Sequence, residues 1–155
     1  MNKKLFYAIR SEDLNTVKKI LKETPGLLNT KDERGSTPLL LASYYGYLKI
    51  TEFILSLNPD LDQKDGSGNT ALMGVAFKGH TEVARKLVEA GADVNSTNGM
   101  GHSALQFATM FSHPEIVKIL LEYGADKSLK DNKGMTALQQ AEMQGSKELI
   151  EILKD

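Results

Sequence analysis

The chain has 155 residues, of which 41% are hydrophobic and 25% charged, and its 19 Lys and Arg against 20 Asp and Glu give a formal net charge of −1. A chain of this length and composition can bury about two-thirds of its unfolded surface without a disulfide or structural metal. The absence of cysteine from the sequence excludes disulfides, thiolate metal sites and a cysteine nucleophile, and the balanced charge disfavours nucleic acid as the main partner.

The N-terminal segment contains a short apolar run at residues 5–9, which follows Lys3 and Lys4. A secretory signal needs about 7–15 apolar residues and a cleavage site of small residues, and a membrane span needs about 20 apolar residues. Neither pattern is found. We therefore expect a cytoplasmic protein that does not act at a membrane.

One unit recurs every 33 residues from residue 32 onward. A glycine marks each copy, with Asp or Asn three residues before it and Thr or Ser two residues after it. The glycines are Gly35, Gly68, Gly101 and Gly134, and the hydroxyl residues are Thr37, Thr70, Ser103 and Thr136. A hydroxyl side chain in this place predicts a helix N-cap, and Pro38 after Thr37 suits the first helical turn.

Each copy continues as a first helix, a short break and a second helix. The breaks fall at Gly46, Gly79, Ser112 and Gly145. Apolar residues at spacings of three and four then predict one buried helix face: Ile50, Phe53 and Ile54; Val83, Leu87 and Val88; Ile116, Ile119 and Leu120; Leu149, Ile152 and Leu153. Gly91 and Gly124 suit the left-handed position after a helix. Since no single copy has enough apolar surface for a closed core, the copies must stack.

The 33-residue step, together with the segments at residues 32–39, 79–83 and 91–95, resembles the ankyrin repeat family. The resemblance implies an all-α solenoid of stacked helix-turn-helix units with β-turn fingers, forming a single domain over residues 1–155. Residues 32–64, 65–97 and 98–130 are full repeats. Residues 1–31 resemble a degenerate N-terminal repeat, in which Val17, Ile20 and Leu21 keep the apolar positions. Residues 131–155 resemble a C-terminal capping repeat, whose polar face carries Gln140, Glu142, Glu148 and Glu151.

Two departures from the family pattern affect the first helices. Leu40, Met73, Gln106 and Gln139 stand where the family usually has His, so the hydrogen bonds of that His are replaced or absent, and we expect looser fingers. Gly74 stands where the neighbouring copies have Leu41 and Phe107, and a glycine inside a helix costs about 1 kcal/mol relative to alanine. We expect the Phe107 ring to lean into the space left at Gly74.

Catalytic, cofactor and metal sites are not indicated. Residues 66–71 and 99–104 match a relaxed dinucleotide-binding fingerprint, but no strand precedes either stretch. Asp60, Asp62 and Asp65 do not have the spacing of a calcium loop. His80 and His113 occupy equivalent repeat positions, which favours a structural role. With no nucleophile, base and orienting partner grouped in the pattern, we expect no enzyme, no cofactor and no metal.

The resemblance places binding residues at the free ends of the first helices and at the finger tips. The positions at the helix ends are Tyr44, Tyr45, Phe77, Lys78, Met110, Phe111 and Met143, and those at the tips are Arg34, Asn69, Met100, His102 and Met135. This set is rich in aromatic residues and methionine, which are enriched at protein interfaces. We expect Tyr44, Phe77, Met110 and Met143, with Tyr45 and Phe111 beside them, to form an apolar ridge about 25–30 Å long on the concave face, because neighbouring helices pack about 8–10 Å apart.

The sequence thus favours a non-catalytic protein-binding module, an adaptor, inhibitor or accessory subunit, that grips a partner protein in a concave groove rich in aromatic residues and methionine. We expect a monomer. One alternative is a structural protein that self-associates through the same ridge or an end repeat. A second is that the ridge side chains only pack against the neighbouring repeat.

Overall fold

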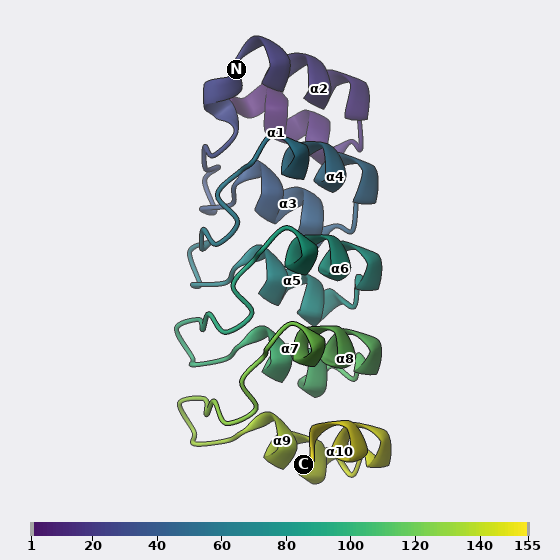
Figure 1. The fold of residues 1–155 in the computed structure, drawn as a ribbon. Coiled ribbons are helices and arrows are strands. Elements are labelled where there is room, and N and C mark those ends of the chain that lie inside the picture. Colours follow the sequence, from purple (N-terminus) through teal and green to yellow (C-terminus); the bar gives the residue numbers. More distant parts are fainter. Residues whose placement is uncertain (1, 155) are drawn as a thin grey trace.

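The computed structural model describes residues 2–154, which form ten α-helices and one short 3-10 helix and contain no strand. The α-helices follow one another as five pairs (Figure 1). The pairs are α1 (Asn2–Arg10) with α2 (Leu14–Glu23), α3 (Pro38–Tyr44) with α4 (Leu48–Ser56), α5 (Ala71–Lys78) with α6 (Thr81–Glu89), α7 (Ala104–Met110) with α8 (Pro114–Glu122), and α9 (Ala137–Gln144) with α10 (Lys147–Leu153); the 3-10 helix η1 covers Pro25–Leu27. The predicted all-α stack of helix-turn-helix units is confirmed.

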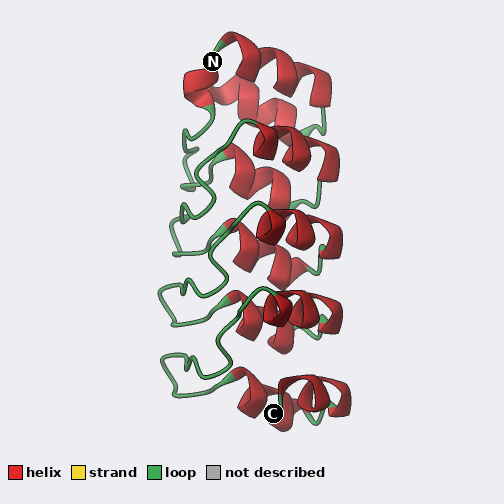
Figure 2. Ribbon diagram, viewed as in Figure 1, coloured by secondary structure: helices red, strands yellow, loops and turns green. Residues whose placement is uncertain are grey.

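The helices form two rows that run along the stack. The first helices α1, α3, α5, α7 and α9 pack on one another in sequence, and so do the second helices α2, α4, α6, α8 and α10. The two chain ends lie at opposite ends of the stack (Figure 1). The long loops between successive pairs all project on the same side (Figure 2), and these loops are the predicted fingers. One helix pair falls within each of the five predicted units.

The predicted N-caps of four first helices are confirmed. The Thr37 hydroxyl accepts a hydrogen bond from the backbone N–H of Leu40 at 3.1 Å, which satisfies one of the free N–H groups at the start of α3. Thr70, Ser103 and Thr136 do the same at the starts of α5, α7 and α9. The recurring hydroxyl therefore sets where each first helix begins.

Each finger is closed by its recurring Asp or Asn. Asp32 Oδ1 accepts the backbone N–H groups of Arg34 and Ser36, both at 2.9 Å, across a tight turn that contains Gly35. The corresponding oxygens of Asp65, Asn98 and Asp131 accept the equivalent pairs of N–H groups. Because one side-chain oxygen holds two backbone donors, every finger has the same shape whatever residue occupies its tip.

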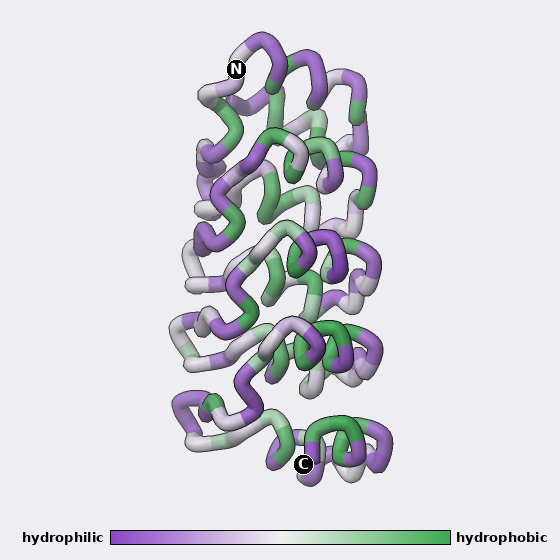
Figure 3. Tube along the Cα trace, viewed as in Figure 1, coloured by the Kyte–Doolittle hydropathy of each residue, from purple (hydrophilic) through white to green (hydrophobic). Residues whose placement is uncertain are grey.

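The core lies between the two rows and continues through the stack. The helices carry most of the hydrophobic stretches of the trace, while much of the loops is hydrophilic (Figure 3). The fully buried side chains include Ile54, Leu87, Ile116 and Leu120, which belong to the predicted apolar faces of the second helices. Val17, Ile20 and Leu21 of α2 are buried as well. Each pair buries its apolar surface against its neighbours, as stacking requires.

Side chains of one repeat bond to the end of the first helix in the preceding repeat. His80 Nε2 lies 2.9 Å from the carbonyl oxygen of Tyr44, and His113 Nε2 lies 3.2 Å from that of Phe77. A carbonyl can only accept, so Nε2 carries the proton in both rings. One repeat further on, the Gln144 side chain donates a hydrogen bond to the Met110 carbonyl at 2.9 Å. These contacts give both histidines the structural role that the repeat pattern predicts.

We expect Thr51→Val to stabilise the protein by about 1 kcal/mol, because a buried hydroxyl without a partner costs free energy that an apolar group of the same shape does not. Thr51 is fully buried in α4, and its hydroxyl has no partner among residues 2–154. The same repeat position holds the buried apolar residues Ala84 and Val117. Urea unfolding followed by circular dichroism measures the change. A lower midpoint for Thr51→Val than for the parent would contradict the prediction.

Candidate functional site

A groove runs between the first helices and the fingers in the N-terminal half of the stack. It has a volume of about 460 Å³. Its floor comes from α3 and α5, including Leu40 and Met73, and one end is formed by Phe107 of α7. The fingers at residues 32–36 and 65–69 form the opposite wall. Volumes of about 300–1,000 Å³ are typical of pockets that accept small ligands, so the groove has room for one or two large side chains.

Gly74 lies on the floor of this groove, and the predicted exchange with Phe107 is wrong. A Cβ atom built on Gly74 would meet Cδ1 of Tyr44 at 3.4 Å and no other side chain of residues 2–154 within 4 Å. Phe107 instead contacts Phe77 edge-to-face, with ring centroids 6.2 Å apart, and lies next to Phe111 at 6.4 Å. The Phe107 ring is held between Phe77 of α5 and Phe111, so the space beside Gly74 stays open.

Most of the predicted ridge is exposed. The exposed fractions are 39% for Tyr44, 44% for Tyr45, 38% for Phe77, 45% for Phe111 and 74% for Met143. Met110 is half-buried, which interrupts the exposed row between Phe77 and Met143. The rings contact one another: Tyr44 meets Tyr45 edge-to-face at 5.8 Å, and Phe77 meets Phe111 in the same way at 4.6 Å. The ridge therefore presents two aromatic clusters, each with one side packed and the other open to solvent.

The predicted finger-tip residues divide into two groups. Arg34 and Met100 are exposed, whereas Asn69, His102 and Met135 are half-buried. The Asn69 side chain accepts a hydrogen bond from Asn98 of the next finger at 2.9 Å. His102 and Met135 belong to the polar network described next. These three residues thus support the stack, and Asn69 also lines the groove.

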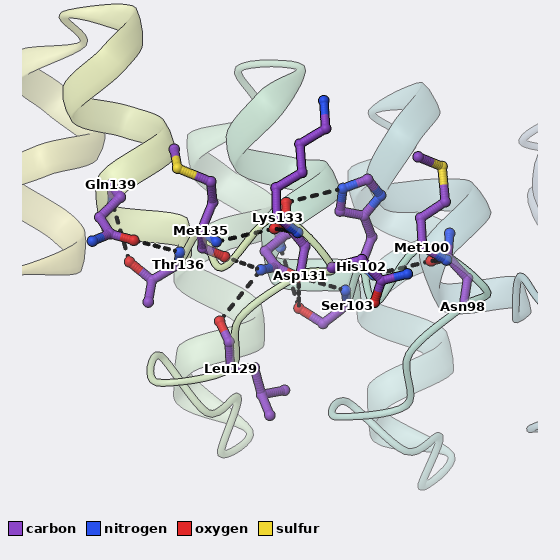
Figure 4. A network of polar contacts seen from close by, with 12 residues as sticks. Asn98, Met100, His102, Ser103, Leu129, Asp131, Lys133, Met135, Thr136 and Gln139 are labelled. Carbon is purple, nitrogen blue, oxygen red and sulfur yellow. Dashed lines mark hydrogen bonds and ion pairs between the residues drawn. The ribbon is translucent and has the colours of Figure 1, made fainter.

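His102 joins two neighbouring fingers. Its ring points toward the finger of the next repeat (Figure 4), and its Nε2 lies 3.3 Å from Oδ2 of Asp131. The pKa of the Asp131 carboxyl is lowered, chiefly by the backbone N–H that it accepts from Met135; burial acts in the opposite direction, and Lys133 N–H and His102 add to the lowering. Both side chains therefore bond to each other within the protein, and His102 helps to hold the two fingers together.

Gln106 replaces the hydrogen bonds expected from the family's His, whereas Leu40 and Met73 are apolar and leave them absent. The Gln106 Oε1 accepts the backbone N–H of Ser103 at 2.8 Å, which completes a capping box at the start of α7. Its Nε2 donates to the carbonyls of Met135 at 2.9 Å and Leu129 at 3.3 Å. The buried amide thus ties α7 to the next finger.

The charges along the groove are unevenly compensated. Arg10 at the end of α1 forms an ion pair with Asp32 at 3.1 Å, and the Asp32 side chain is only 8% exposed. Asp65 accepts two backbone N–H groups of its own finger. The guanidinium of Arg34 is exposed and has no partner among the described residues, and Lys78 Nζ lies 5.3 Å from the centre of the Tyr44 ring. Among the described residues, Arg34 is therefore a cation without a partner at the rim of the groove, and Lys78 lies over the ring of Tyr44, which lines it.

Sequence reasoning did not find Arg10, Asp32, Leu40 and Met73 as groove residues. Asp32 and Met73 were seen only as parts of the repeat pattern, and Arg10 lies in the degenerate first unit, where the register is weak. No group of His, Asp or Glu within residues 2–154 could hold a metal ion. Among the helices of that part of the chain, none is long and apolar enough to cross a membrane.

The stacked helix pairs with projecting fingers define a helical-repeat solenoid. A family model described as ankyrin repeats (3 copies) matches residues 5–98 and 91–155, and the chain belongs to the ankyrin repeat family. Ankyrin repeats are typically protein–protein interaction modules and usually non-catalytic, and no catalytic domain is matched.

One similar protein is the ankyrin repeat and SAM domain-containing protein 6 of Mus musculus. It is 32% identical to this chain over 59 residues. The match covers 38% of this chain and 7% of the mouse protein. The chain therefore spans only a small part of that relative's length.

Proposed function

We propose that the protein is a non-catalytic binding module that grips another protein along the groove and the aromatic ridge. The observation that carries this proposal is the exposure of Tyr44, Tyr45, Phe77, Phe111 and Met143 on one side of the stack, next to an open groove. A monomeric protein commonly tolerates only a few hundred square ångströms of contiguous apolar surface, and a larger patch marks an interaction site.

The arrangement of the rings supports binding more than packing alone. Each aromatic cluster buries one side against its neighbours, which fixes its orientation before a partner arrives. A preorganised surface loses little conformational entropy when it binds. Methionine at the far end of the ridge adapts its shape to an irregular partner.

The experiment that tests this proposal is affinity capture from the source cell with quantitative mass spectrometry. The triple variant Tyr44→Ala, Phe77→Ala, Phe111→Ala removes three aromatic side chains of the ridge. It should reduce the recovery of specific partners at least tenfold, because aromatic anchors dominate binding energy at interfaces. Leu57→Ala with Tyr123→Ala is the matched control, since it removes exposed apolar side chains at the ends of α4 and α8. Circular dichroism verifies that both variants remain folded. Unchanged recovery with the triple variant would refute the assignment.

The alternative is self-association, in which a second copy of the chain binds to the same surface. Static light scattering of the parent and the triple variant separates the two functions. A monomer in both cases supports a foreign partner. A dimer that dissociates when the three rings are removed would make the protein a structural, self-associating one.

A further inference from the structure

The groove departs from the repeat pattern at Gly74, where the missing side chain leaves an open space. The same position of the first helix carries Leu41 in the preceding repeat and Phe107 in the following one. Both side chains line the groove, together with Tyr44, Met73 and Phe77. We name this opening the Gly74 recess. On the side of the helices its walls are apolar or aromatic, apart from Arg10 at the end of α1.

Apart from Arg10, the charged groups of the described residues that border the recess lie on the side of the fingers. Asp32 and Asp65 lie there, but Asp32 is paired with Arg10 and both carboxylates accept backbone N–H groups of their own fingers. Arg34 is exposed on the same rim and has no partner within residues 2–154. An occupant therefore meets apolar side chains on the helix side, beside the Arg34 guanidinium, which forms no ion pair within the described part of the chain.

We propose that the Gly74 recess accepts one bulky apolar side chain of a linear segment of the partner protein, and that an acidic side chain next to it pairs with Arg34. This inference rests on the proposed binding function and specifies the partner's chemistry. The volume of the groove suits one or two side chains and not a whole helix, which favours a linear segment. An arginine fork at an interface pairs well with a carboxylate, since its donors match both oxygens.

The recess can be filled without breaking the helix. Gly74 lies inside α5, and its backbone is not in the left-handed region that requires glycine. A Cβ there has ordinary contact with Tyr44. Gly74→Leu reproduces the residue of the preceding repeat and replaces a poor helix former by a good one. The variant should therefore unfold at the same or a higher urea concentration than the parent, so that a loss of binding cannot be attributed to unfolding.

The test uses a phage-displayed library of random dodecapeptides, selected on the parent protein. We expect enriched peptides to carry Phe, Leu, Met or Trp within two residues of Asp or Glu. A synthetic peptide of the enriched sequence should bind the parent in calorimetry and lose at least tenfold in affinity with Gly74→Leu. Arg34→Glu should weaken the same peptide at least fivefold. Lys133→Glu, at the same finger position three repeats further on, should leave the affinity unchanged.

The outcomes separate this inference from the proposed function. Enriched peptides that lack an acidic or a bulky apolar residue, or that bind equally well to Gly74→Leu, overturn the inference. If such peptides still lose affinity with Phe111→Ala, the ridge binds proteins and only the recess is wrongly assigned. If no peptide is enriched, or none responds to Gly74→Leu or Phe111→Ala, both proposals fail.

Discussion

Gly79→Ala should lower the free energy of unfolding by about 2–4 kcal/mol, which is a large part of the stability of a domain. Gly79 ends α5 with φ +86°, where a Cβ atom costs about 1–2 kcal/mol. A Cβ would also lie 2.5 Å from Cε1 of His113 in the next repeat. The ring would have to move, and its hydrogen bond to the Phe77 carbonyl would be lost, which adds about 1 kcal/mol.

Two control variants divide this cost into its parts. Gly145→Ala introduces a methyl group at the same repeat position with φ +71° but with no neighbour within 4 Å, so it should cost only the backbone strain. In the double variant Gly79→Ala, His113→Ala, the clash is removed and the two losses should not add. Equilibrium unfolding in urea measures the parent, these three variants and the single variant His113→Ala, which completes the double-mutant cycle. Equal losses for Gly79→Ala and Gly145→Ala would show that the contact with His113 contributes nothing.

The residue type at each break varies with the residue that precedes the second helix of the next repeat. In the repeat after Gly46, the residue just before the second helix is His80, and in the repeat after Gly79 it is His113. Ser112 has the same left-handed conformation with φ +60°, but the following repeat has Ser146 in place of a histidine. Among these three breaks, a side chain is thus found where the next repeat has no histidine.

The helices and their starts could be predicted because they depend on local rules that recur. Thr37 and Ser103 cap their helices through a bond to a residue three positions later, and Asp32 closes a turn within its own finger. These interactions are short-range, so the residue types and their spacing contain the necessary information. The stacking follows from the apolar faces, which cannot be buried within one repeat.

The side-chain arrangement in the groove could not be predicted in the same way. The repeat register correctly places Gly74 and Phe107 at equivalent positions, but it does not say which neighbour fills the gap. Phe107 lies beside Phe77 and Phe111, whereas the edge of Tyr44 approaches Gly74. The choice depends on rotamers and on contacts between three repeats, and a pattern of residue types contains neither.

Gln106→Leu should destabilise the protein by about 2–4 kcal/mol and weaken the coupling of the last helix pair to the rest of the stack. The Gln106 side chain is 3% exposed and holds the Ser103 N–H and the carbonyls of Met135 and Leu129. Leucine has a similar size but no polar group, so the Ser103 N–H and the Leu129 carbonyl lose these bonds, while the Met135 carbonyl keeps the bond from the Asp131 N–H. An unsatisfied buried backbone group costs about 1–3 kcal/mol.

The effect should fall mainly on the contact between α7 and the finger at residues 131–135. In a repeat protein each unit is stabilised by its neighbours, so weakening one contact lets the units beyond it open separately. Hydrogen exchange should therefore show faster exchange in α9 and α10 than in α3 and α5, while urea unfolding gives the overall loss. Gln139→Leu is the matched control: Gln139 is exposed, and within residues 2–154 its side chain bonds only to the Thr136 N–H, so its replacement should cost about 0.5–1 kcal/mol. A loss for Gln106→Leu no larger than for Gln139→Leu would show that the buried amide does not tie the repeats together.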